Sequence, residues 1–194
     1  MMLLPVLKEP DPRLRIKAKS IEKVDDEIRQ LMDDMLETMY HDDGIGLAAT
    51  QIGSDKRVIV IDLNSGTEEK PEVFYMANPE ILWRSEEKSS LQEGCLSVPE
   101  TRAEISRPAR IKIRYLDRNN KQIEMDANGI FATCVQHEID HLNGVLFIDY
   151  LSRLKQDLIQ KKLKNLKSFI LYDKAKANFY GYAVFCSRGP SRHC

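Results

Sequence analysis

The sequence predicts a single compact α+β domain, with antiparallel β-sheets packed around a central helix and further helices near both ends. Three observations support this fold class. Helical spacing of apolar residues occurs near both ends and once more around residues 130–143, the middle holds short β-rich segments bounded by turn residues, and no regular βαβ alternation links them. The 194 residues, 42% hydrophobic, can bury one core without disulfides. We expect the domain to cover residues 1–170.

The first predicted helix is Asp25–His41, where apolar residues recur at helical spacing and acidic residues favour the first turn. Gly44 and Gly46 are expected to end it in a tight turn. Three predicted strands follow, at Arg57–Asp62, Phe74–Asn78 and Ile111–Tyr115.

The central helix is predicted at Ile130–Asn143, because helical spacing returns there and Gly144 suits the left-handed position after a helix end. A last helix is predicted at Leu151–Phe169. Its core face would consist of Leu151, Leu154, Leu158, Leu166 and Ile170, with the lysines outside. Residues 171–194 show no period and are left outside the domain as a tail of unassigned origin.

Composition excludes several classes of function. The formal net charge of -1 gives no reason to expect nucleic-acid binding. The apolar start Met1–Leu4 is interrupted too early for a signal peptide or a membrane span, so we expect a cytoplasmic protein. In that compartment the four cysteines are expected to be thiols or metal ligands rather than a disulfide framework.

The segment from His137 to His141 carries the strongest chemical signal. Two histidines four residues apart share one face of a helix and can bind one metal ion. Glu138 between them is placed to accept a proton from water, as in zinc hydrolases. The alternative is a solvated helix with two incidental histidines. Apolar neighbours such as Val135 favour burial, and Asp140 is placed to orient a ligand.

A catalytic metal usually has three protein ligands and one open position. Cys134 lies seven residues before His141, about 10.5 Å along a helix, which is too far to share the ion. Cys186 and Cys194 lie in the tail. Cys95 therefore becomes the predicted third ligand, although an isolated cysteine is more commonly a buried thiol. A Cys/His/His set suits zinc, iron, cobalt or nickel.

Three segments in this order resemble the signature motifs of the peptide deformylases, and the resemblance extends from about Leu4 to Phe169. The segments are Gly44-Ile45-Gly46-Leu47-Ala48-Ala49-Thr50-Gln51, Glu93-Gly94-Cys95-Leu96-Ser97 and His137-Glu138-Ile139-Asp140-His141-Leu142-Asn143-Gly144. The resemblance implies an enzyme that hydrolyses the N-formyl group from the initiator methionine of nascent proteins and releases formate. Metal-bound hydroxide would attack the formyl carbon, with Glu138 as general base and acid. Ferrous iron is the metal that the resemblance favours, and zinc, nickel or cobalt could replace it.

The resemblance also implies roles for other residues. The Gln51 side chain and the backbone N–H of Leu96 would stabilise the oxyanion. Arg102 would pair with Asp140 and brace the helix. The substrate pocket would be formed by Gly44, Ile45, Gly46, Leu91, Glu93, Gly94, Ile130 and Cys134.

The implied partners are N-formylmethionyl nascent peptides, with a ribosome contact through the lysine-rich helix as a secondary expectation. Two other functions compete with this one. A zinc peptidase would use the same histidine helix but leaves Cys95 and Gln51 unexplained. A structural metal module would close all four metal positions with protein ligands and would have no use for Glu138.

Overall fold

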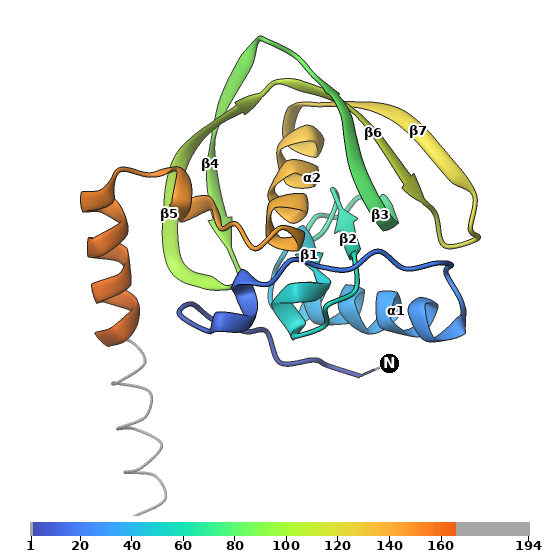
Figure 1. Cartoon of the computed structure of the whole chain (residues 1–194), viewed down its shortest axis with the longest axis horizontal. Coiled ribbons are helices and arrows are strands. Elements are labelled where there is room, and N and C mark those ends of the chain that lie inside the picture. Colours follow the sequence, from blue (N-terminus) through green and yellow to red (C-terminus); the bar gives the residue numbers. More distant parts are fainter. Residues whose placement is uncertain (1, 166–194) are drawn as a thin grey trace, which may run out of the picture.

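The computed structural model describes residues 2–165 and confirms the α+β fold class. Helix α2 (Gly129–Leu142) lies between two sheets, with α1 (Asp26–His41) at one end (Figure 1). One sheet is antiparallel and has the strand order β1-β2-β3-β6-β7. Its strands are β1 (Gly46–Ala48), β2 (Val58–Asp62), β3 (Val73–Arg84), β6 (Arg110–Leu116) and β7 (Gln122–Asn128). The other sheet is the hairpin of β4 (Lys88–Cys95) and β5 (Val98–Pro108).

The helices begin and end near the predicted positions. Asp25 is the N-cap of α1 and accepts a hydrogen bond from the backbone N–H of Ile28. Gly144 follows α2 with φ +76°, and a Cβ there would lie 2.5 Å from the carbonyl oxygen of Arg15. Short 3₁₀ helices occupy Pro12–Arg15, Ala49–Ile52 and Phe147–Tyr150, and residues 153–165 form a last helix. None of the helices in this part of the chain is long and apolar enough to cross a membrane.

The buried core holds α2 in place. The apolar side of α2, including Val135 and Ile139, packs with side chains of the five-stranded sheet such as Ile61 and Ile113. A second cluster joins α1 to β1, β2 and β3. Burial of α2 from several directions explains why its polar residues also end in the interior, where they require partners.

Several predicted elements need correction. The segment Gly44–Gln51 is more than a helix stop, because Gly46–Ala48 pairs with β2 as strand β1 and Ala49–Ile52 forms a 3₁₀ helix. Strand β3 extends well beyond the predicted Phe74–Asn78. Strands β4, β5 and β7 were not predicted, because their alternating side chains include many charged and polar residues on the outer face.

The predicted core face of the last helix is wrong at Leu154 and Leu158, whereas Leu151 is partly buried against the core, as predicted. Leu154 is 71% exposed and Leu158 is 60% exposed, whereas Leu163 is buried and Ile159 is partly buried. The helix lies beside β5 (Figure 1) and packs against the cluster formed with the β4–β5 hairpin and Phe147–Tyr150. Leu166, Ile170 and the whole 171–194 tail lie outside the described residues, so the 170/171 boundary stays a prediction.

Candidate metal centre and active site

Cys95, His137 and His141 converge at one point, as the sequence predicted. One nitrogen or sulfur atom from each lies within 4.8 Å of the corresponding atoms of the other two. Cys95 Sγ is 3.1 Å from His141 Nε2. The histidines come from successive turns of α2, and Cys95 is the last residue of β4, so the group joins the helix to the hairpin.

The imidazole ring of His137, a candidate metal ligand, is oriented by a contact at its Nδ1 nitrogen. Its Nδ1 lies 2.8 Å from Glu93 Oε2, and Arg107 donates to both oxygens of that carboxylate at 2.5 and 3.0 Å. Arg107 also donates to Asp140 Oδ2 at 2.7 Å, and the hydroxyl of Tyr150 donates to the same oxygen at 2.9 Å. A carboxylate on the second ring nitrogen fixes the orientation of a ligand histidine.

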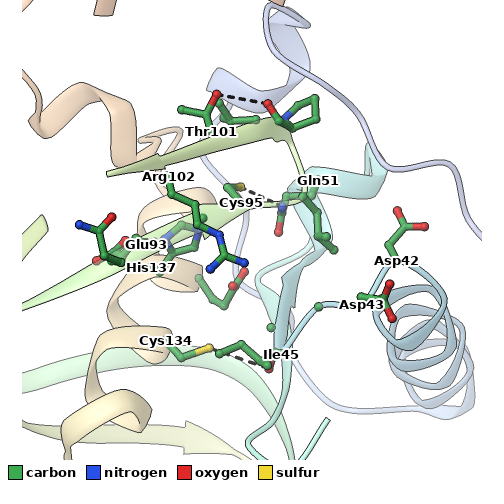
Figure 2. Close-up of a pocket in the computed structure, with 18 of the residues that line it drawn as sticks. Asp42, Asp43, Ile45, Gln51, Glu93, Cys95, Thr101, Arg102, Cys134 and His137 are labelled. Atoms are coloured by element: carbon green, nitrogen blue, oxygen red, sulfur yellow. Dashed lines mark hydrogen bonds and ion pairs between the residues drawn. The ribbon is translucent and has the colours of Figure 1, made fainter. Parts of the chain in front are cut away.

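These contacts correct the expected role of Arg102, because the partner of Asp140 is Arg107. Side chains of a strand point alternately to opposite faces. Ala103, Ile105 and Arg107 occupy the inward positions of β5, whereas Arg102 is exposed. Arg102 instead lies beside Gly94 at the cavity (Figure 2). The alternation around Ile105 was the signal that could have identified Arg107.

Glu93, predicted as a pocket residue, lines the cavity and is also buried. Burial by itself raises the pKa of this carboxyl, but the hydrogen bonds from His137 and Arg107 outweigh it, so the pKa is lowered. Glu93 therefore carries a stabilised negative charge behind the ligand His137.

Glu138 is a buried carboxylate whose environment differs from that of Glu93. Its Oε2 accepts no hydrogen bond from the described residues, and burial raises its pKa to about 7 against the opposing effect of His137. A Cβ on Gly46 would lie 2.6 Å from Glu138 Oε1 and 2.8 Å from Cys134 Sγ. Only glycine at position 46 leaves room for this carboxylate, which can take up and release a proton.

Gln51 points its amide group at the cysteine of the site. Its Oε1 accepts from the backbone N–H of Ala48 at 2.9 Å, which directs Nε2 toward Ser97 Oγ at 3.1 Å and Cys95 Sγ at 3.6 Å. Figure 2 shows the Gln51 and Cys95 side chains facing each other. Thr50 in the same 3₁₀ helix donates to the carbonyl of His141 at 3.0 Å, which ties this segment to α2.

A cavity of about 1110 Å³ opens beside these groups. It is lined by every residue expected in the substrate pocket: Gly44, Ile45, Gly46, Leu91, Glu93, Gly94, Ile130 and Cys134. Cys134 Sγ reaches toward the carbonyl of Ile45, and burial keeps its pKa well above the usual range, so the thiol stays protonated (Figure 2). A neutral thiol beside apolar groups suits a pocket wall. Asp42 and Asp43 also line the cavity, which the sequence did not predict.

The donor set fits a divalent transition metal. One thiolate and two imidazoles are the ligand types that zinc and iron sites use, and three protein ligands leave a position for a reacting molecule. Glu138 lines the cavity together with Cys95 and His137, and its buried Oε2 is an acceptor without a protein partner among the described residues. The three residues could therefore chelate one divalent metal ion, and their ligand types suit zinc, iron, cobalt or nickel.

The comparisons with known proteins agree with each other. The family model "Polypeptide deformylase" matches residues 3–157. A peptide deformylase of Phenylobacterium zucineum (strain HLK1) is 57% identical over 165 residues, which cover 84% of this chain and 96% of the relative.

Solved structures give the same result. The crystal structure of peptide deformylase from Ehrlichia chaffeensis superposes with a TM-score of 0.82 and 42% identity, over 87% of this chain and 99% of the other. A second structure from that organism, in complex with actinonin, gives a TM-score of 0.80 and 45% identity over 85% and 98% of the two chains. With a family model and relatives matched over most of its length, this chain belongs to the polypeptide deformylase family of hydrolytic enzymes.

Proposed function

We propose that this protein removes the N-formyl group from the initiator methionine of nascent peptides by metal-dependent hydrolysis, with release of formate. The observation that carries the proposal is the convergence of Cys95 with two histidines of α2, next to Glu138, whose buried Oε2 has no hydrogen-bond partner among residues 2–165. Membership of the deformylase family gives the reaction, and this geometry supplies groups suited to it.

Cys95, His137 and His141 would hold the ion. When bound, such an ion supplies Lewis-acid chemistry, which polarises a carbonyl oxygen and makes a water molecule more acidic. Ferrous iron remains our proposal for the native metal, and zinc, nickel or cobalt could occupy the same ligands.

Glu138 would act first as the general base and then as the general acid. The oxygen of a water molecule bonds to the formyl carbon as one water proton passes to Glu138. The carbon–nitrogen bond then breaks, and Glu138 returns that proton to the departing amine. The products are formate and a peptide with a free amino terminus. A carboxyl group whose pKa is raised by burial can both accept a proton and donate it again.

Gln51 and Leu96 would stabilise the negative charge that develops on the formyl oxygen. The Gln51 amide is already oriented by Ala48, so it requires little rearrangement when the charge appears. Leu96 follows Cys95 directly, which would place its backbone N–H close to the same oxygen.

The methionine side chain would occupy the apolar part of the cavity. Ile45, Leu91 and Ile130 provide its lining, with the Cys134 thiol at its wall. Gly46 would hydrogen-bond the peptide backbone, because a strand such as β1 offers main-chain groups to an extended peptide. We place this activity in the cytoplasm, where nascent chains are made, and a ribosome contact through the lysines of residues 155–167 stays a prediction.

The decisive test measures formate release from formyl-Met-Ala-Ser by anaerobically purified protein, with metal analysis of the same sample. We expect stoichiometric formate and about one divalent ion per chain. Cys95→Ala should lose both the ion and the activity, whereas Cys134→Ala should keep the ion. Internal cleavage of unformylated peptides without formate would instead support the zinc peptidase, and metal binding without any turnover would support a structural module.

A further inference from the structure

The N-terminal segment Leu7–Glu9 makes three contacts with the parts of the chain that carry the proposed oxyanion donors. The backbone N–H of Leu7 donates to the carbonyl of Gln51 at 2.7 Å, and that of Glu9 donates to the carbonyl of Ser97 at 2.8 Å. Between them, Lys8 Nζ donates to the carbonyl of Leu96 at 2.7 Å. Three consecutive residues thus bind both donor segments.

The carbonyls that accept these bonds lie where regular structure supplies no partner. Leu96 and Ser97 form the two-residue turn of the β4–β5 hairpin, between the paired residues Cys95 and Val98. Gln51 lies near the end of a short 3₁₀ helix, where the last carbonyls point out of the helix. Backbone carbonyls in such positions need a partner from elsewhere in the chain. Here all three partners come from Leu7–Glu9.

We propose that Leu7–Glu9 sets the relative placement of the two oxyanion donors and that Lys8 is its positioning residue. This inference rests on the proposed function of Gln51 and Leu96. The β4–β5 turn is part of the two-stranded sheet, whereas the 3₁₀ helix follows β1 of the five-stranded sheet. Their direct link is the Gln51 side chain, which bonds Ser97 and Cys95. Leu7–Glu9 adds hydrogen bonds to the backbone carbonyls on both sides of that link, in the 3₁₀ helix and in the β4–β5 turn.

Lys8 differs from its two neighbours because it acts through its side chain. Its ammonium lies 3.9 Å from Asp42 Oδ2 at the end of α1, and both residues line the cavity. The side chain is 46% exposed, so its loss should cost little folding stability. The same loss frees the turn that carries Leu96, and small displacements of catalytic donors reduce rates strongly.

Lys8→Met tests the inference, because it keeps the aliphatic stem and removes the ammonium. We expect kcat for formyl-Met-Ala-Ser to fall about tenfold, while KM changes less than twofold. Metal content and the unfolding temperature should match wild type. Lys8→Arg keeps a cationic donor and should restore most of kcat.

Lys19→Met is the matched control. Lys19 is also an exposed lysine in contact with an aspartate, Asp55, and it does not line the cavity. It should retain wild-type kcat. A tenfold loss in this variant as well would assign the effect to net charge and overturn the inference, as would an unchanged kcat in Lys8→Met or a loss confined to KM.

A second measurement separates this inference from the proposed function. Amide hydrogen exchange of residues 95–98 needs no substrate, and it should be faster in Lys8→Met and normal in Lys8→Arg. Wild-type protein that releases no formate would contradict the proposed function and leave the exchange result interpretable. Active wild type with unchanged exchange in Lys8→Met would contradict the positioning role alone.

Discussion

Helix α2 and the helix at residues 153–165 use their side chains in opposite ways. In α2 even polar and charged residues such as Gln136, His137 and Glu138 are buried. In the last helix, Leu154 and Leu158 are exposed although leucine is among the residues most often buried. Burial therefore follows from what surrounds a helix, and most of α2 is covered by neighbouring elements, although Ile130 in its first turn is 58% exposed.

The largest expected effect comes from Glu138 of α2, whose Oε2 atom has no hydrogen-bond partner among the described residues. Glu138→Gln keeps the size of the side chain but removes its ability to accept a proton, so formate release should fall about 10²- to 10⁴-fold. Metal content, measured on the same preparation, should not change. Turnover within tenfold of wild type would show that another group carries the proton and would weaken the assigned role of α2.

The next effect concerns the charges that surround α2. Arg107→Leu leaves the buried carboxylate of Glu93 and the partly buried carboxylate of Asp140 without this cation, which should destabilise the protein by about 3–5 kcal/mol at neutral pH. Urea unfolding of the metal-free forms measures this difference. Arg118→Leu provides a comparison, because Arg118 pairs with Asp33 in a more exposed position. This substitution should lower the free energy of unfolding much less.

The penalty in Arg107→Leu should depend on pH. Arg107 helps to keep the pKa of Glu93 below its ordinary value of 4.5, so the stabilisation is present above that value and is lost as pH falls through the lowered pKa. The difference in free energy of unfolding between Arg107→Leu and wild type should therefore become smaller below pH 4.5. A constant difference across this range would show that lost packing, not charge, explains the effect.

The smallest effect is expected at the exposed leucines. Leu154→Gln and Leu158→Gln should each change the free energy of unfolding by less than about 0.5 kcal/mol. Leu163→Ala, in the same helix but buried, should cost about 2–5 kcal/mol. If Leu154→Gln proved as costly as Leu163→Ala, a contact outside residues 2–165 would cover that face, and the contrast with α2 would disappear.

The sequence predicted the helices and the two histidines of the candidate metal group from local spacing, whereas Cys95 was predicted because the other cysteines were excluded. Two histidines four residues apart define their own geometry, and Asp25 caps the helix that it precedes. The β4–β5 hairpin was missed because its polar outer face obscures the apolar alternation. Arg107 was missed for the same reason, since its inward direction is known only once the strand is recognised.

The core face of the last helix could not be predicted from spacing alone. Leu154 and Leu158 lie four residues apart, as a buried pair would. The choice between that face and the one with Ile159 and Leu163 is made by the hairpin and by Phe147, all distant in sequence. The contacts of Leu7–Glu9 were equally inaccessible, because hydrogen bonds to turn carbonyls leave no pattern in the residues that make them.

The order in which the site assembles during folding follows from its connections along the chain. Cys95 and His141 are 46 residues apart, Glu93 and His137 are 44 apart, and Lys8 contacts Leu96 across 88 residues. Contacts that close such long loops carry a large entropic cost and tend to form late. A partly folded chain would have its two histidines aligned on a nascent helix before the cysteine and the N-terminal segment arrive. Catalytic competence should therefore appear only with the final step of folding.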